Sequence, residues 1–197
     1  MYSDVCVVIL AGGRSSRMGF DKALLRIGGK PLIQSLADLA TQLAGEVLIS
    51  TNDPTHYLFL NLPIVEDTYK GQGPLAGLHA GMARTKKSLV LLLGCDLPNA
   101  SRMPLGRIVD GAPGFDAVVP RTSDGRLHPH CAVYRRTCLD LLREQLEAGR
   151  NKAAEFLSRP GLHVRVLDPE EGGFSDSDLV NLNTPEDLKM LAPAGDP

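Results

Sequence analysis

Residues 5–22 read VCVVILAGGRSSRMGFDK. The first six form a continuous apolar run that is rich in β-branched side chains, which is typical of a strand buried on both faces. The run ends at Gly12 and Gly13, where positive φ angles are accessible and backbone N–H groups can point at phosphate oxygens. Arg17 and Lys22 then add mobile positive charge. This stretch therefore predicts the first strand of a parallel α/β sheet, followed by a loop that binds a polyanionic small ligand.

Apolar runs alternate with helical patterns through most of the chain beyond this loop. Further strands are predicted at residues 47–50, 64–65, 89–93, 116–120, 131–134 and 163–167, and helices at residues 31–43, 75–83, 138–146 and 184–191. Such alternation indicates a parallel sheet with helices on both faces. We therefore predict a three-layer α/β/α Rossmann-like fold with a mostly parallel central sheet. A single domain is expected over residues 1–192, with residues 193–197 as a disordered tail.

The composition of the 197 residues is that of an ordinary globular protein, with 43% apolar and 22% charged residues. A formal net charge of −2 gives no reason to expect nucleic acid or a membrane as a partner. Positive charge is concentrated locally, because residues 14–30 carry five cations and one acid. Neither a transmembrane stretch nor a signal-peptide pattern is visible. With four cysteines and no CxxC pair, no disulfide framework is predicted, so we expect a reducing, cytoplasmic location.

Two carboxylates follow predicted strands at the edge of the sheet where ligands bind. In an open parallel sheet this edge lies beyond the carboxyl ends of the strands. Asp67 follows the strand at residues 64–65, and Asp96 follows the apolar run at residues 89–93. Asp96 is thus expected on the ligand side of the sheet, near the first loop. Its carboxylate is a ligand of the kind that Mg²⁺ binds together with phosphate oxygens and water.

Two familiar phosphate-binding motifs do not fit the loop after the first strand. The loop lacks the GK[ST] ending of a P-loop and is not GxGxxG, so neither a P-loop NTPase nor a dinucleotide-binding oxidoreductase is predicted. It instead resembles the signature LA[GA]GxSxRMGxxK of nucleotidyltransferases with a Rossmann-like fold. The matching positions are Leu10, Ala11, Gly12 or Gly13, Ser15 or Ser16, Arg17, Met18, Gly19 and Lys22.

The double glycine narrows the resemblance to one family. Gly12-Gly13 is similar to the molybdenum cofactor guanylyltransferases of the MobA type, whereas Ala-Gly is commoner in the cytidylyltransferase relatives. Further segments resemble that family in its own order: GGKPLIQ at 28–34, IVED at 64–67, GPLAGLHAGM at 73–82, CDLP at 95–98, HP at 128–129 and NLNTPEDL at 181–188. The resemblance implies the nucleotide-diphospho-sugar transferase type of fold. It also implies Mg²⁺-dependent transfer of GMP from GTP to the terminal phosphate of molybdopterin, with release of pyrophosphate. The implied partners are these two substrates and proteins of molybdenum cofactor biosynthesis or molybdoenzyme maturation.

The same resemblance implies roles for particular residues. Catalysis falls on Arg17, Lys22 and Asp96, nucleotide binding on Leu10, Ala11, Gly12, Gly13, Lys22, Asp67 and Asp96, metal binding on Asp96, and acceptor contacts on His128, Asn181 and Asn183. Asp67 is expected at the base or ribose. The family also places an Asn near the end of the second strand. Here Ser50 takes that aligned position and Asn52 lies two residues later, so the contact falls to Ser50, to Asn52 or to the backbone alone.

Three points stay open at the level of sequence. Residues 128–131 (HPHC) have no second cluster at ligand spacing, so a turn that places His128 or Arg126 near the acceptor is favoured over a zinc site. The acidic residues 168–178 are expected to form a solvated loop, with a lid over the acceptor as the alternative. The function has two alternatives: a cytidylyltransferase acting on a pterin, sugar or polyol phosphate, and a nucleotide-binding partner protein without turnover.

Overall fold

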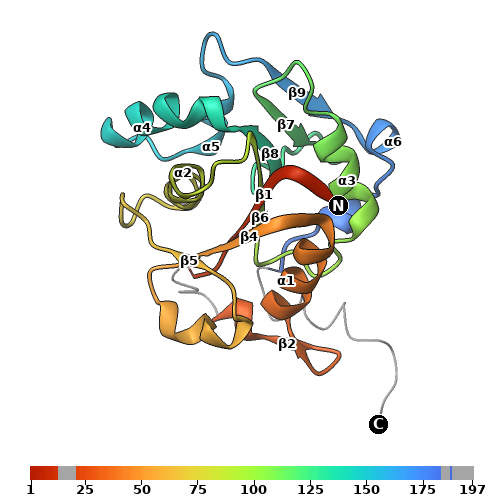
Figure 1. The fold of residues 1–197 in the computed structure, drawn as a ribbon. Helices are drawn as coiled ribbons and strands as arrows, with labels where there is room; N and C mark the ends of the chain where they lie inside the picture. The colour runs from red at the N-terminus through yellow and green to blue at the C-terminus, as the bar shows by residue number, and fades with distance from the viewer. Residues whose placement is uncertain (13–20, 183–186, 188–197) are drawn as a thin grey trace.

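A seven-stranded sheet lies at the centre of the protein (Figure 1). The computed structural model describes residues 1–12, 21–182 and 187. The order of the strands across the sheet is β5-β4-β1-β6-β8-β7-β9. Their bounds are β1 Tyr2–Leu10, β4 Ala44–Ser50, β5 Ile64–Val65, β6 Leu89–Gly94, β7 Ala117–Pro120, β8 Cys131–Arg135 and β9 Val164–Leu167.

The sheet is mostly parallel, as the alternation of strands and helices predicts. Strands β5, β4, β1 and β6 pair in parallel, and so do β7 and β9. Only β8 runs the other way, antiparallel to β6 on one side and to β7 on the other. A short antiparallel hairpin of β2 (Arg26–Ile27) and β3 (Lys30–Pro31) stands apart from this sheet.

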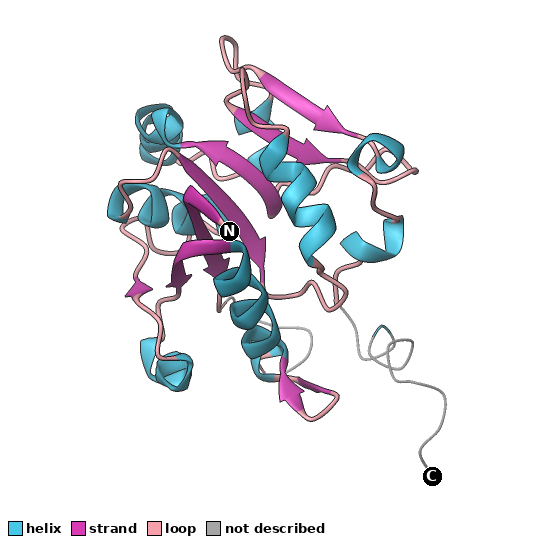
Figure 2. Ribbon diagram, turned by 45° about the vertical axis from the view of Figure 1, so that its right-hand side comes forward, coloured by secondary structure: helices cyan, strands magenta, loops and turns pink. Residues whose placement is uncertain are grey.

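Helices cover both faces of the sheet, which gives the predicted three layers (Figure 2). On one face lie α1 (Leu32–Leu43) and α3 (Arg102–Asp110). On the other lie α2 (Pro74–Arg84), α4 (Leu139–Glu147) and α5 (Ala153–Leu157). Shorter helical segments are η1 Lys22–Leu24, η2 Pro54–Leu60, η3 Arg136–Cys138, α6 Pro169–Gly172 and η4 Asp176–Leu179.

Strand β1 is buried on both faces, which explains why polar and apolar residues do not alternate in its sequence. Side chains of successive strand residues point to opposite faces. Val7 and Ile9 pack in the core under α1 and α3, while Cys6 and Val8 pack in the core under α2 and α4. A strand that is buried on both faces therefore reads as a continuous apolar run.

The acidic residues 168–178 differ from their prediction as a solvated loop. They contain α6 and the start of η4, and Phe174 is only 7% exposed. Ser175 and Asp178 form a capping box at the start of η4. The buried ring of Phe174, together with this capping, anchors the segment. The prediction of a loop was therefore wrong for α6 and the start of η4, while most residues of the segment are exposed to solvent as expected.

The structure contains two helices and a hairpin that the sequence did not predict. Helices α3 and α5 and the β2–β3 hairpin were not predicted, because each is short and α3 contains Pro104 and Gly106, which disfavour a helix. The helix expected from residue 184 and the tail at 193–197 lie outside the described residues, except for residue 187.

All four cysteines are free thiols, as expected. No helix within the described part of the chain is long and apolar enough to cross a membrane.

Candidate active site

The carboxyl ends of four parallel strands meet at one edge of the sheet. Leu10 at the end of β1 is paired with Ser50 of β4 on one side and with Gly94 of β6 on the other. Ser50 is in turn paired with Val65 of β5. The loops that leave these strands are therefore neighbours in space, although they are separated along the chain. This is the edge at which ligands bind in open α/β sheets.

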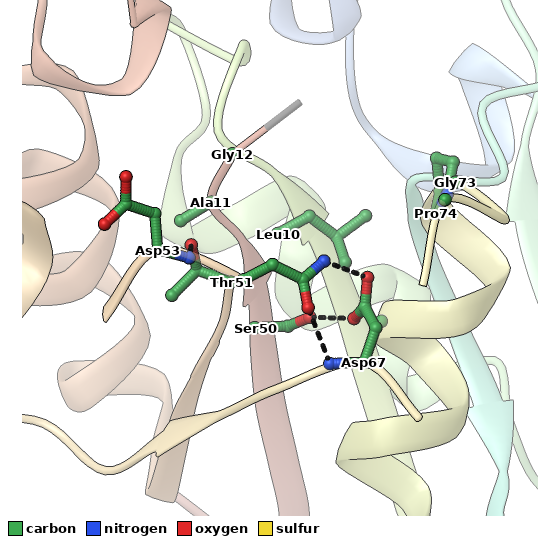
Figure 3. Close-up of a pocket in the computed structure, with 12 residues that line it drawn as sticks. Leu10, Ala11, Gly12, Ser50, Thr51, Asp53, Asp67, Gly73 and Pro74 are labelled. Atoms are coloured by element: carbon green, nitrogen blue, oxygen red, sulfur yellow. Dashed lines mark hydrogen bonds between the residues drawn. The ribbon is translucent and has the colours of Figure 1, made fainter. Parts of the chain in front are cut away.

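A cavity of about 650 Å³ opens between the loops that follow β1, β4 and β5 (Figure 3). It is lined by Leu10, Ala11, Gly12, Ser50, Thr51, Asn52, Asp53, Asp67, Gly71, Gly73, Pro74 and Gly77. Its volume lies in the range of pockets for small-molecule ligands. Gly12 has a φ of 105°, which an L side chain rarely adopts, so a glycine is required where the chain leaves β1. The cavity brings together four predicted nucleotide-binding residues: Leu10, Ala11, Gly12 and Asp67.

Hydrogen bonds hold Asp67 against the end of β4. Ser50 Oγ donates to one carboxylate oxygen at 3.2 Å, and Asn52 Nδ2 donates to the other at 3.0 Å (Figure 3). The Asp67 backbone N–H donates to Asn52 Oδ1 at 3.2 Å. Ser50 and Asn52, between which the sequence left the choice open, thus both line the cavity and both orient Asp67. Each carboxylate oxygen keeps further capacity to accept a hydrogen bond from a ligand.

Helix α2 packs directly behind the cavity because Gly77 has no side chain. A Cβ at this position would lie 2.6 Å from Ser50 Oγ and would also overlap Leu10. The small residue therefore sets the distance between α2 and the ends of β1 and β4. One turn earlier, α2 begins at Pro74, on the cavity wall.

A second cavity of about 220 Å³ lies at the end of β6. It is lined by Asp96, Leu97, Arg126, Leu127, His128, Pro129, His130, Cys131 and Asn181. This cavity brings Asp96, the predicted metal ligand, together with His128 and Asn181, two residues predicted on the acceptor side. Asp96 lines this cavity and does not line the larger one, although β1 and β6 are neighbours.

Asp96 is a carboxylate in a partly buried position. Burial raises its pKa, an effect opposed by its own backbone N–H and by the nearby side chains of His130, Lys22 and Arg126. Gly94 provides the room for this carboxylate, because a Cβ there would lie 2.6 Å from Asp96 Oδ1. The donor chemistry fits Mg²⁺, which binds one or two carboxylates together with phosphate oxygens and water. A cation would also offset the burial of the Asp96 charge.

The HPHC run forms a turn into β8, as the sequence favoured. Cys131 N donates to His128 O at 3.0 Å, and Tyr134 Oη donates to Pro129 O at 2.8 Å. Burial is the largest cause that lowers the pKa of His128 and His130, so both imidazoles favour the neutral form. Within the described residues, no three His, Cys, Asp or Glu side chains come together to hold a metal ion.

The second cavity also contains His130, which was not predicted, and Arg126, which was expected near the acceptor as an alternative to His128. Arg126 and His130 both line it. Their signal in the sequence was their closeness to His128, which is two residues from each. Residues 126–131, which include the turn at Pro129, form one wall of the cavity, so Arg126 and His130 lie there together with His128.

The C-terminal segment connects the two sides of the site. Lys22 Nζ donates to Leu182 O at 2.9 Å, and Leu182 N donates to Asp96 O at 2.8 Å. Residues 22, 96 and 182, which are far apart in the sequence, therefore meet. Arg17, Gly13 and Asn183 lie outside the described residues, so their predicted roles stay predictions.

These features define a class of protein. A glycine turn after the first strand, a cavity at the carboxyl edge of a mostly parallel sheet and an adjacent carboxylate are those of a Rossmann-like nucleotide-binding protein. The model of the MobA-like NTP transferase domain matches residues 7–164 of this chain. The chain belongs to this family.

Relatives and solved structures agree with that assignment. A probable molybdenum cofactor guanylyltransferase of Pelotomaculum thermopropionicum is 35% identical over 184 residues, which cover 92% of this chain and 88% of the relative. The molybdenum cofactor guanylyltransferase of Desulfosudis oleivorans is 32% identical, covering 95% and 94%. The structure of molybdopterin-guanine dinucleotide biosynthesis protein A from Archaeoglobus fulgidus superposes with a TM-score of 0.80 at 25% identity, over 94% of this chain and 96% of that one. The fold and the family expected from the sequence are thus confirmed.

Proposed function

We propose that this protein transfers GMP from GTP to the terminal phosphate of molybdopterin and releases pyrophosphate. The support from relatives is their naming as molybdenum cofactor guanylyltransferases over nearly the whole chain. The structural observation that carries the proposal is that the two cavities lie at the ends of neighbouring strands. β1 ends at Leu10 and β6 ends at Gly94, and these two residues are paired across the sheet. A transfer between two bound phosphates requires two such adjoining sites.

The larger cavity is the proposed GTP site. Asp67, oriented by Ser50 and Asn52, presents carboxylate oxygens that can accept hydrogen bonds from the base or the ribose. The backbone at Gly12 leaves β1 without a side chain, which allows close approach of phosphates. By resemblance, Lys22 and Arg17 supply positive charge to the triphosphate.

The smaller cavity is the proposed acceptor site. Arg126 offers a guanidinium that can bind a phosphate through two donors. A neutral imidazole can donate one hydrogen bond and accept another, and in His128 the Nε2 atom already lies 3.3 Å from Thr122 Oγ1 in a hydrogen bond. The attacking oxygen belongs to a phosphate that is already anionic, so the chain needs no general base to activate it. Positioning and charge neutralisation remain as the main tasks of the protein.

Magnesium dependence is part of the proposal. Asp96 would hold the ion, which when bound neutralises phosphate charge and helps to orient the reacting groups. Burial raises the pKa of Asp96, and a bound cation would offset this effect by favouring the charged carboxylate. We also propose a cytoplasmic location, which suits the four free thiols, and contacts with molybdenum cofactor biosynthesis or molybdoenzyme maturation proteins.

The test is pyrophosphate release from purified protein with Mg²⁺ and molybdopterin, comparing GTP, CTP, ATP and UTP. We expect release with GTP, and a fall of about a hundredfold or more in Asp96→Ala, because charge stabilisation at the reacting phosphates is lost. Asp140→Ala, which removes an exposed carboxylate on α4, is the matched control and should keep full activity. Omitting Mg²⁺ should abolish release.

Other outcomes would move the protein to one of its alternatives. Release with CTP alone would make it a cytidylyltransferase. No release with any of the four nucleotides, with GTP still bound, would favour a partner protein without turnover. Both outcomes would overturn the proposal.

A further inference from the structure

A buried tyrosine hydroxyl joins η2 to the end of the glycine-rich signature. Tyr57 lies in η2 and is only 1% exposed. Its hydroxyl donates to Asp21 Oδ2, and Asp21 Oδ1 accepts a hydrogen bond from Ala23 N at 3.0 Å. Both oxygens of Asp21 are therefore engaged, immediately before Lys22 in the chain. We name these two residues the Asp21–Tyr57 pair.

The pair holds the short helix that carries Lys22. Asp21 is the N-cap of η1, whose first residue is Lys22 and whose second, Ala23, is fully buried in the core. Burial, followed by the hydrogen bond to Asp21, raises the pKa of Tyr57 far above its usual range, so the phenol stays a neutral donor. With its cap held by Tyr57 and Ala23 anchored in the core, η1 has a defined position, and Lys22 with it.

The other end of the connection is the wall of the larger cavity. Helix η2 begins at Pro54, directly after Asp53, which lines that cavity. Asp53 N donates to Thr51 Oγ1 at 3.1 Å, and Thr51 N donates to Val65 O at 3.0 Å. The segment from the end of β4 to Tyr57 is thus tied to the sheet at one end and to Asp21 at the other.

We propose that the Asp21–Tyr57 pair positions Lys22 on the triphosphate and so makes the protein prefer a nucleoside triphosphate over a monophosphate. The inference rests on the proposed function in one respect, namely that the larger cavity binds GTP within reach of Lys22. Asp21 and Tyr57 are positioning residues, because they act through Lys22 and line neither cavity.

The test compares the affinities for GTP and GMP by titration calorimetry. Tyr57→Phe removes only the hydroxyl and keeps the buried ring. We expect it to weaken GTP binding about three- to tenfold, because Lys22 is held less firmly, with GMP binding within about twofold of wild type. Asp21→Ala should do the same, and the double variant should bind GTP no more weakly than Asp21→Ala alone.

Two controls separate positioning from general destabilisation. Tyr2→Phe removes a hydroxyl that donates to Asp110 Oδ1 at 2.7 Å, at the far end of β1, and should change neither affinity. In a Lys22→Ala background, Tyr57→Phe should have no further effect on GTP, because the residue through which it acts is gone. Equal losses for GTP and GMP in Tyr57→Phe, or a further loss in the Lys22→Ala background, would overturn the inference.

The affinities of the wild-type protein for GTP and GMP distinguish failure of this inference from failure of the proposed function. If it prefers GTP over GMP and Tyr57→Phe keeps the same ratio, only the inference on the Asp21–Tyr57 pair is wrong. If the wild-type protein binds neither nucleotide, the GTP site itself is wrong, and both proposals are overturned.

Discussion

Asp67 and Asp96 occupy similar places in the sequence but different environments in the structure. Each follows a strand of the parallel sheet. Asp67 accepts hydrogen bonds from Ser50 and Asn52 in the larger cavity. Asp96 is partly buried in the smaller cavity, where burial raises its pKa. Asp67 is therefore suited to accepting hydrogen bonds from hydroxyl and amino groups, and Asp96 to binding a cation.

We expect His79 to make the free energy of unfolding depend on pH. Burial lowers its pKa below the usual 6.5, Arg143 adds to this, and Glu147 opposes it. In the described residues no hydrogen-bond partner reaches its Nδ1, and the ring packs edge-on against Tyr69. The folded state therefore favours the neutral imidazole, whereas the unfolded chain takes up a proton near the usual pKa. The free energy of unfolding should fall as the pH drops below 6.5.

Urea unfolding at about pH 5.5 and about pH 7.5 measures this dependence. His79→Gln should reduce the difference in free energy between the two conditions, leaving the part due to His128 and His130, whose pKa values are also lowered. His163→Gln, at an exposed position, should leave the difference unchanged. An unchanged difference in His79→Gln would contradict the role of this residue.

At the scale of elements, α2 and the acidic segment hold the two cavities in shape. Helix α2 approaches the sheet at two glycines, Gly77 against the ends of β1 and β4 and Gly81 against Val8 in the middle of β1. The acidic segment, residues 168–178, holds the turn that leads to the second cavity. Neither element supplies a predicted catalytic residue, yet each sets where such residues lie.

Gly77→Ala and Gly81→Ala should separate packing from binding. Both add a methyl group in a filled space, so each should lower the free energy of unfolding by about 1–3 kcal/mol. Gly77→Ala should also weaken GTP binding, because the added Cβ would displace Ser50 and Leu10 in the cavity. Gly81→Ala meets only Val8, so its GTP affinity should match that of wild type. Denaturant unfolding and calorimetry measure the two effects, and equal GTP affinities in both variants would contradict this account.

Asp176 should affect the acceptor and not the nucleotide. It accepts hydrogen bonds from Ser123 N at 2.9 Å and Ser123 Oγ at 3.2 Å, in the turn that carries Arg126. Asp176→Ala should raise KM for molybdopterin about three- to tenfold through the freed turn, with KM for GTP unchanged. Glu170→Ala, an exposed residue of the same segment, is the control. Initial rates of pyrophosphate release at varied acceptor and GTP concentrations measure the two KM values. A change in KM for GTP alone would exclude this role of Asp176.

At the scale of the whole molecule, the layers were predictable because their signal is local. The apolar run at residues 5–10 and the later runs at 47–50 and 89–93 became β1, β4 and β6 with small changes at their ends. The place of β8 was not predictable. A four-residue apolar run carries no sign of its neighbours, and its antiparallel insertion between β6 and β7 depends on pairing across the sheet.

The sequence by itself determined the strand–helix alternation, the family and the placement of Asp67 and Asp96 after strands, since each depends on residues close together in the chain. Tertiary structure alone decided that Ser50 and Asn52 both hold Asp67, and that Arg126 and His130 join Asp96 in the second cavity. It also decided that Tyr57 holds the residue before Lys22. The physical reason is that these contacts depend on strand register and on hydrogen bonds between distant segments. Such contacts form only when the chain closes around the edge of the sheet.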